Sequence, residues 1–499
     1  MRWEYETPLT ERFNRLVSEF DFEVPNPIEA QARANYAQRP IPEIPVSEFR
    51  VRGGLTWVNQ GGRGRSPFRG ERNNVMPRFG FAYQLDNRTV LRGGYGIFYN
   101  PNGTAVTVPI QTGFTQMTPI QASLDNGLTY RATTANPFPD GLLQPLGPAG
   151  GLTTNLGQAI EFYNYNEKYA YAQRWSFGVQ RLLPGHMVAD ISYVANRGTR
   201  LSVTRQYNAL PNQYLSRSPL RDQATIDYLS ATFPSPFRGL APVYGANISR
   251  ASLLRPYPHF GDISAEEPVG YSWYHSLQTR VEKRFSQGWT LQLAYTFSKF
   301  MEATSFLNPA DPMPYEVISS LDFPHRLAAS AIWEIPVGKG RRFGANMPAV
   351  LNHMLGGWQL GAIVTRQSGA PLGWGNIIFI GDIKQIPLPK SQRTADRWFN
   401  TEAGFNRDSR QQLAYNWRAF PPRFAGIRGD DQRSWDFSIT KDFPLREGLK
   451  LRFRADAYNA LNQTNFASPN TTPTSTAFGT ITSTAGDPRN WQLSLKVVF

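Results

Sequence analysis

Five histidines are the residues of this chain best suited to ligate a metal or to transfer a proton: His186, His259, His275, His325 and His353. None stands at metal-ligand spacing from another histidine or from a carboxylate, and the H-E-x-x-H motif is absent. The chain has no cysteine, which excludes disulfides, thiolate nucleophiles and cysteine-bound zinc or iron–sulfur clusters. Because no G-x-S-x-G nucleophile elbow occurs either, we expect no enzyme, no metal site and no cofactor.

Two further patterns suggest ion or nucleic-acid binding. Asp430 and Asp431 could hold a cation in a loop, although a solvated turn is the commoner arrangement. The Arg-Gly-Gly copies at Arg52–Gly54 and Arg92–Gly94 resemble RNA-binding segments, and 52 Lys and Arg against 38 Asp and Glu give a net charge of +14. However, the second copy lies inside an alternating strand, where glycine relieves crowding, and the basic residues are scattered. We therefore expect no nucleic-acid partner.

The elements that position these residues are long strands. Apolar and polar residues alternate with period two in about a dozen segments of about ten residues, such as Trp289–Phe297 and Leu449–Ala457. Strands of soluble proteins are most often about 5–6 residues long, whereas a tilted strand that crosses a bilayer needs about 9–11. One short helix is predicted within Met347–Leu355, and no apolar run of about 18 residues, as a membrane-spanning helix requires, is present.

The connections between these strands fall into two kinds. Short ones with Gly, Asn or Asp, typical of tight turns, occupy residues 85–88, 183–186, 285–288 and 445–448. Long ones occupy residues 101–169, 197–271, 301–323, 370–433 and 462–489. Outer-membrane barrels have short periplasmic turns, long outer loops and aromatic girdles at both interfaces. Aromatic residues do stand near the strand ends: Trp175, Tyr193, Trp289, Trp333, Trp358, Trp435 and Trp491.

The order and spacing of several segments resemble the barrel of Oar-like TonB-dependent outer-membrane receptors. These segments are Val75–Tyr99, Tyr169–Arg200, Tyr271–Lys299, Arg452–Phe466 and Phe478–Phe499. The resemblance implies a barrel of about 22 strands that surrounds an N-terminal plug domain. It also implies a TonB box that couples the plug to the energised inner membrane, and a signal peptide.

About a dozen strands cannot close a barrel of that size. We therefore expect an all-β, antiparallel transmembrane β-barrel that is incomplete, with residues 1–499 as its C-terminal part and with the plug domain, TonB box and signal peptide absent. Met1 is then expected inside a barrel strand. Counting strands back from a periplasmic Phe499 makes residues 7–47 a periplasmic turn of improbable length. Either Phe49–Val58 belongs to an outer loop, or one strand escapes the pattern.

Two groups of strand residues are the candidate sites. The apolar side of the last strand resembles the signal read by the outer-membrane assembly machinery, by strand pairing at a sheet edge: Trp491, Leu493, Leu495, Val497 and Phe499. A possible charge ladder faces the lumen: Lys450, Arg452, Arg454, Arg280, Glu282 and Arg284. This ladder could line a channel, contact a plug or steer anionic solutes, or it could consist of cross-strand ion pairs alone.

These patterns predict a protein of the bacterial outer membrane. Its expected partners are membrane lipid, the barrel-assembly machinery, an unknown extracellular ligand and, only through the missing plug, TonB. The expected function is TonB-energised uptake of a ligand that the outer loops capture. One alternative is an adhesion or surface-interaction protein anchored by the same barrel. A second alternative is a soluble, secreted β-rich binding protein, in which the apolar residues would pack between two sheets.

Overall fold

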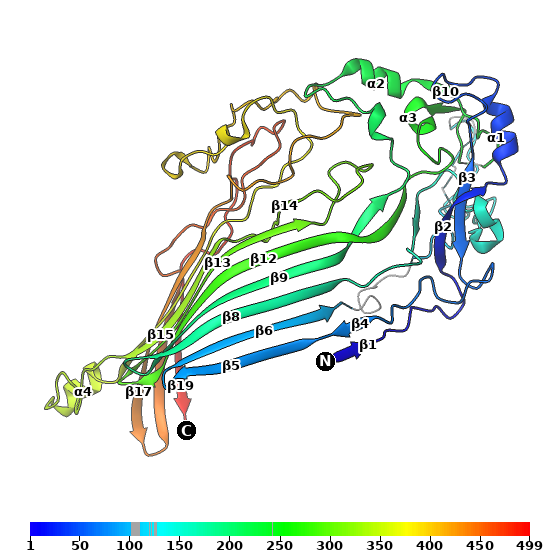
Figure 1. The fold of residues 1–499 in the computed structure, drawn as a ribbon. Helices are drawn as coiled ribbons and strands as arrows, with labels where there is room; N and C mark the ends of the chain where they lie inside the picture. The colour runs from blue at the N-terminus through cyan, green and yellow to red at the C-terminus, as the bar shows by residue number, and fades with distance from the viewer. Residues whose placement is uncertain (101–109, 119, 121, 124–126, 242) are drawn as a thin grey trace.

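One large sheet dominates the computed structural model, which describes residues 1–499 except 101–109, 119, 121, 124–126 and 242 (Figure 1). Its strands pair antiparallel in the order β19-β18-β17-β16-β15-β13-β12-β9-β8-β6-β5. They are β5 (Arg78–Asp86), β6 (Thr89–Tyr99), β8 (Tyr171–Leu183), β9 (Met187–Gln206), β12 (Ile263–Ser286), β13 (Trp289–Ala303), β15 (His325–Glu334), β16 (Trp358–Gln367), β17 (Gln432–Arg446), β18 (Leu449–Tyr458) and β19 (Asn490–Val498). The predicted antiparallel all-β fold is confirmed.

Strand register keeps an apolar and a polar face separate across the whole sheet. On one face Leu495 pairs with Phe453, and on the other Lys496 pairs with Arg452. The apolar face is exposed in many large side chains: Phe79, Phe81, Phe177, Ile191, Tyr193, Leu277, Phe297, Leu493 and Leu495. A soluble protein would cover so large an apolar surface. The arrangement expected of the soluble alternative, with these residues packed between two sheets, is therefore not found.

The two ends of the sheet differ as the connections predict. Short turns join β5 to β6, β8 to β9, β12 to β13 and β17 to β18 at one end, the periplasmic end by analogy with outer-membrane barrels. The long connections gather at the other, outer end (Figure 1). A helix is found within the range predicted for it, α4 (Ala349–Leu355), at the periplasmic end.

The sheet is open in the part of the chain that the structure describes. Strand β5 pairs only with β6 among the main strands, and β19 only with β18. Because neighbouring strands alternate in direction along the path, β5 and β19 run the same way. Near the outer start of β5, the short strand β1 (Arg2–Glu4) pairs antiparallel with β4 (Asn74–Met76) in a separate sheet. Met1 therefore stands directly before a short strand that pairs with β4 and not with a strand of the main sheet.

The N-terminal segment does not cross the sheet. Strands β2 (Val17–Pro25) and β3 (Arg52–Trp57) form their own two-stranded sheet, packed with the outer connections. Residues 49–58 thus belong to the outer side, as the first of the two alternatives predicted. Residues 7–47 therefore do not have to form a long periplasmic turn. We call residues 7–73, with the described parts of 110–168 and 207–262, the outer cap. Its core surrounds Phe20, whose ring centroid lies 5.3 Å from that of Tyr257.

Short elements complete the fold. The cap contains α1 (Glu29–Tyr36), η1 (Gly147–Thr153), β7 (Ile160–Phe162), η2 (Asn212–Tyr214), α2 (Gln223–Ser230), β10 (Thr232–Pro234), β11 (Asn247–Ser249) and α3 (Arg250–Leu253). We call residues 368–431 and 462–489 the outer lobe; they pack around a second core that includes Trp374 and Phe399, and they contain η3 (Ile383–Gln385) and η4 (Lys390–Gln392). Strand β14 (Val317–Ile318) pairs with β13.

One predicted boundary is wrong. The connection expected at 197–271 is shorter, because β9 continues to Gln206 and β12 begins at Ile263. The extra residues of both strands include polar side chains. Glu266 illustrates how they pair: its carboxylate accepts hydrogen bonds from Ser202 and Thr204 of β9 at 2.6 and 2.5 Å.

Aromatic residues occupy both ends of the apolar face. Trp175, Trp435 and Trp491 lie near the outer starts of their strands, whereas Trp289 pairs with Trp333 at the periplasmic end. None of the helices in the described residues is long and apolar enough to span a membrane.

Two lysines stand at the periplasmic end of this apolar face. The Lys283 Nζ donates to the carbonyl oxygens of Ser286 and Trp289, at 2.8 and 3.1 Å, and lies 4.3 Å from the Trp289 ring centroid. The Lys441 Nζ donates in the same way to the carbonyls of Met354 and Gly356, at 2.9 and 2.7 Å. Each ammonium therefore reaches turn backbone beyond the apolar band, as lysines near an interface do.

Replacing Lys283 with methionine should lower the free energy of unfolding by about 1–3 kcal/mol, because partly buried turn carbonyls lose their donor. Urea titration of the protein in lipid vesicles measures the change. Lys496→Met, at an exposed lysine on the polar face of β19, is the matched control and should shift the midpoint little. Equal midpoints for the two variants would contradict this role.

Candidate functional site

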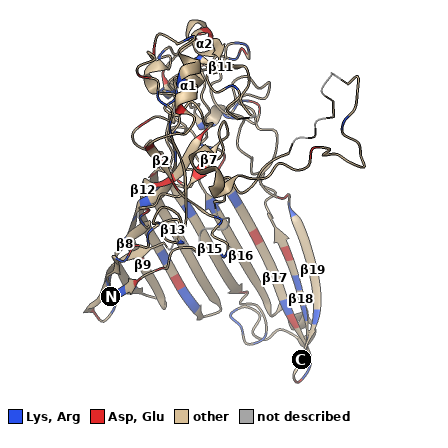
Figure 2. Cartoon of the chain, turned by 90° about the vertical axis from the view of Figure 1, so that its right-hand side faces the viewer, with Lys and Arg blue, Asp and Glu red and all other residues tan. Residues whose placement is uncertain are grey.

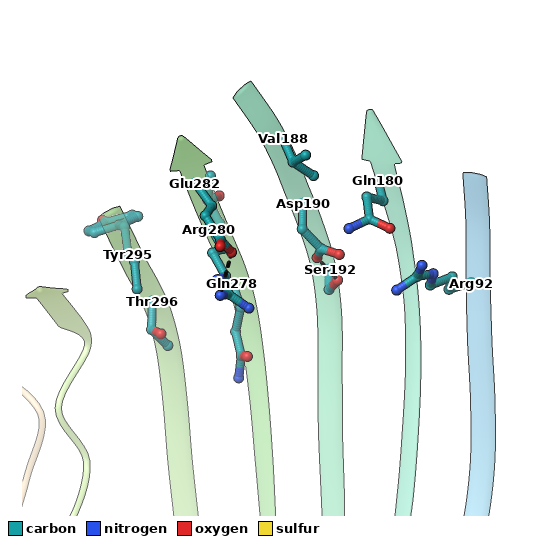
Figure 3. Close-up of a pocket in the computed structure, with 12 residues that line it drawn as sticks. Arg92, Gln180, Val188, Asp190, Ser192, Gln278, Arg280, Glu282, Tyr295 and Thr296 are labelled. Carbon is teal, nitrogen blue, oxygen red and sulfur yellow. Dashed lines mark hydrogen bonds and ion pairs between the residues drawn. The ribbon is translucent and has the colours of Figure 1, made fainter. Parts of the chain in front are cut away.

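The polar face of the sheet, called here the polar wall, carries the residues that could contact a solute. Its charged residues include Arg92, Asp190, Arg280, Asp442 and Arg452, and bands of both charges cross the strands (Figure 2). Between β6 and β13 the wall is hollowed by about 340 Å³, and Figure 3 shows the lining side chains. They include Arg92, Gln180, Asp190, Ser192, Gln278, Arg280, Glu282 and Thr296.

Charges in this hollow are held by short contacts. The Arg280 Nη2 donates to Glu282 Oε2 at 2.6 Å along the same strand, and Arg280 stands opposite Asp190 of β9. The Asp190 carboxylate accepts a hydrogen bond from Ser192 at 2.5 Å. Arg92 stands opposite residues without long side chains, so its guanidinium is not crowded by them. The hollow therefore offers fixed donors, acceptors and charges of both signs to a polar molecule.

The second predicted group lies on the same wall near the other edge. Asp442 accepts both guanidinium hydrogen bonds of Arg452, at 2.6 and 2.9 Å, and its Oδ2 lies 2.6 Å from the Lys450 Nζ. Arg454 binds Asp456 at 2.8 Å. We did not select Asp442 from the sequence, although the alternation of polar and apolar residues in β17 places it on the same face as Arg452.

The ladder residues share one face but are not brought together. Strands β13, β15, β16 and β17 lie between Arg280 of β12 and Arg452 of β18. Arg284 is exposed beside the turn that follows β12. The six residues thus form two separate groups on the polar wall. Arg280 binds Glu282 in the first group, and the second group binds Asp442 and Asp456.

The terminal strand lies at a free edge of the sheet. The apolar side chains Trp491, Leu493, Leu495 and Val497 are all more than half exposed, and Phe499 follows directly after the strand. Only β18 pairs with β19 among the described strands. This arrangement presents an apolar face and an unpaired backbone edge together.

Sequence reasoning missed the ion pairs that fix the outer connections to the strands. Asp322 binds Arg428 at 2.5 Å and Glu302 binds Arg423 at 2.7 Å, which ties the outer lobe to the end of β13 and to the connection after it. At the outer ends of β9 and β12, Arg205 binds Glu267 at 2.5 Å. Because the partners lie 62 to 121 residues apart, no local pattern announces them.

Asp431 is neither a solvated turn residue nor a member of a cation site. Its Oδ2 lies 3.0 Å from Arg366 and 3.6 Å from both Lys390 and Arg433. Burial raises its pKa, but the hydrogen bond from Arg366 and the charges of the three cations outweigh burial and hold the pKa below its ordinary value. Asp430 instead accepts the backbone N–H of Phe466 at 3.3 Å.

The histidines have separate surroundings. His259 is fully buried in the cap, where burial lowers its pKa to about 3, so it is neutral at physiological pH. His275 and His325 hydrogen-bond the hydroxyl groups of Tyr193 and Tyr295, at 2.6 and 2.8 Å. In the part of the chain that the structure describes, no three His, Asp or Glu side chains are grouped as a metal site requires.

The Glu167 carboxyl group should make the stability of the cap depend on pH. Burial, followed by the negative charge of Glu266, raises the pKa of Glu167 to about 7. A raised carboxyl pKa stabilises the fold below the unfolded value of about 4.3 and loses that contribution as pH rises through about 7. Between pH 5 and pH 8 we expect the free energy of local opening around Glu167 to fall by about 2 kcal/mol. Hydrogen exchange, corrected for the intrinsic effect of pH on the exchange rate, measures this fall.

Glu167→Gln should flatten this pH profile, because an amide carries no titrating proton. Glu48→Gln, which removes an exposed carboxylate of the same cap, is the matched control and should leave the profile unchanged. A profile that persists in Glu167→Gln would assign the pH dependence to another group.

Comparison with curated proteins finds no match. Among solved structures, the chain is similar to the outer membrane transporter YddB of Escherichia coli, with 12% identity and a TM-score of 0.41, over 85% of this chain and 40% of that one. It is also similar to the ferripyoverdine receptor of Pseudomonas aeruginosa, with 11% identity and a TM-score of 0.37, over 89% and 34%. For the ferric-catecholate import receptor Fiu of E. coli, the sequence identity is 9% and the TM-score is 0.37, over 92% of this chain and 38% of that one.

The chain thus spans about 34–40% of the length of these solved structures. A family comparison covers nearly the whole chain: the outer membrane beta barrel domain matches residues 1–492. That match agrees with the exposed apolar face, the polar wall and the long connections at one end. The chain belongs to the outer membrane beta barrel domain family and is a protein of the outer membrane.

Proposed function

We propose that this chain forms part of the wall of a transporter that takes up an extracellular ligand with energy from TonB. The observation that supports this best is the separation of faces: an apolar face for lipid and, behind it, a hollowed polar wall. An adhesion anchor would need only the apolar face. A wall with fixed charges of both signs along its length suits contact with a moving plug or a polar solute.

Further strands are part of this proposal. In hydrocarbon every unpaired backbone N–H and C=O is costly, so the free edges of β5 and β19 need partners. These two strands run the same way, and antiparallel closure therefore requires an odd number of strands between them. Strand β1 runs opposite to β4, which leads into β5. A strand whose outer end is β1 would cover the β5 edge in the correct direction.

The outer cap and the outer lobe supply the capture surface. Both are packed around their own apolar cores, and the Asp322–Arg428 ion pair ties the outer lobe to the connection after β13. Such loops are already ordered, so ligand binding would not have to fold them. The plug, the TonB box and the Oar-like subtype of the receptor complete the proposal from the resemblance of the sequence.

Gene-deletion epistasis tests the proposal. Strains lacking this gene, lacking tonB or lacking both are grown on a panel of single carbon, nitrogen and iron sources. Uptake predicts at least one source on which both single deletions grow poorly and the double deletion grows no worse. A defect in surface attachment that is independent of tonB, with normal growth on every source, would overturn uptake and support the adhesion alternative.

A further inference from the structure

Two long outer connections meet beside a cleft. The Ser216 N–H donates to the Tyr415 carbonyl and the Trp417 N–H to the Ser216 carbonyl, each at 2.9 Å. Arg221 donates to the Gln412 carbonyl at 2.8 Å. The outer cap and the outer lobe are thus joined by backbone hydrogen bonds at this point, which fixes the two walls of the cleft relative to one another.

The cleft has an apolar floor and a volume of about 560 Å³. Ile377, Phe379 and Phe420 line it and belong to the packed core of the outer lobe. The ring centroids of Phe379 and Phe420 lie 5.3 Å apart. Small-molecule sites are commonly preformed, mostly apolar hollows of about 300–1,000 Å³ with a few fixed polar groups. This floor matches that description.

Polar groups at the cleft are fixed as well. Asn376 and Asn416 exchange two amide hydrogen bonds, at 2.9 and 3.2 Å. The Arg217 guanidinium lies 4.3 Å from the Trp417 ring centroid, and within the described residues no carboxylate lies close enough to form an ion pair with it. Asp382 also lines the cleft, but its carboxylate accepts the Lys384 N–H at 2.9 Å. Arg217 is therefore the group available to a bound anion.

We propose that this cleft binds a small molecule with a planar aromatic body and one anionic group. The body packs on Phe379 and Phe420, and the anionic group accepts hydrogen bonds from Arg217. The inference rests on the proposed function, since it assigns a site and a ligand chemistry to capture by the outer loops.

Isothermal titration of the purified full-length protein tests the assignment, with 2-naphthoate as the probe and 2-naphthamide as its neutral analogue. We expect 2-naphthoate to bind at one site and more tightly than the amide. Arg217→Gln should weaken 2-naphthoate about tenfold, the equivalent of one charge-assisted hydrogen-bonded contact, and leave the amide unchanged. Arg238→Gln, at an exposed arginine of the same connection, is the matched control and should change neither.

A second variant tests the location independently of charge. Ala419 is exposed at the cleft wall, so Ala419→Trp should fill the cleft without disturbing the core and should abolish binding of 2-naphthoate. Equal affinity for the acid and the amide, no binding of either, or unchanged binding to Ala419→Trp would overturn the assignment. This assay involves neither TonB nor transport. Failure here with a tonB-linked growth defect intact would remove the cleft assignment alone, and the reverse result would remove the uptake function.

Discussion

Asp322→Ala is expected to destabilise the attachment of the outer lobe by about 3–5 kcal/mol, as breaking a buried ion pair typically does. Asp322 is fully buried, and its two carboxylate oxygens accept the Phe300 N–H and the Arg428 guanidinium, each at 2.5 Å. Arg428 also donates to the Asp322 main-chain carbonyl at 2.6 Å. Removal of the carboxylate leaves a guanidinium and a backbone N–H poorly paired, and one of the ties between the lobe and the β13–β15 connection is lost.

Limited proteolysis of the protein in vesicles measures this effect, because local opening exposes residues 368–431 to cleavage. Asp408→Ala is the matched control in the same lobe: it removes an ion pair with Arg410 that is largely exposed, and it should leave the cleavage rate nearly unchanged. The double variant Asp322→Ala with Arg428→Ala should recover part of the loss, since no charge is then left unpaired. Cleavage of Asp322→Ala at the control rate would show that other contacts hold the lobe.

Local patterns predicted the sheet well because strand geometry is local. Period-two alternation decides which face a side chain joins, and a strand with one lipid-facing side must keep that alternation. Leu495 and Lys496 were placed on opposite faces from the sequence, and the strand register places them there. Short turns were equally readable, because Gly or Asn at positive φ marks them, as at Gly288.

The structure of the outer connections could not be predicted from the sequence, because it is not determined locally. Its structure depends on contacts between distant segments, such as Asp322 with Arg428, which lie 106 residues apart. The segment 52–57 has strand character, yet it pairs with β2 in the cap rather than with a strand of the main sheet. The cleft at Arg217 lies between two connections that meet at Ser216. No pattern within either connection predicts this contact. Alternation therefore predicts the sheet and its two faces, whereas the arrangement of the outer connections depends on tertiary packing.

Leu493→Arg should cost about 2–4 kcal/mol of stability in the membrane, the range found when a cation is placed on the lipid face of a barrel near the bilayer midplane. Leu493 lies in the middle of β19, with 70% of its surface exposed on the apolar face. The neighbouring Gln492 offers a control at the same depth on the polar wall, where it pairs with Asp456. Gln492→Arg therefore gains an acidic partner and should be tolerated.

The same pair of variants separates burial in lipid from the proposed role of the terminal strand in assembly. Urea unfolding of the full-length protein in lipid vesicles reports burial in lipid without any assembly machinery, whereas the yield of heat-modifiable protein in cells reports assembly as well. We expect Leu493→Arg to lower both the stability in vesicles and the yield of heat-modifiable protein in cells. We expect Gln492→Arg to lower neither. A loss of cellular yield with unchanged unfolding would make Leu493 part of the assembly signal only. Equal unfolding of both variants would contradict the assignment of the faces, because the argument for a lipid-facing surface requires that adjacent residues of β19 differ.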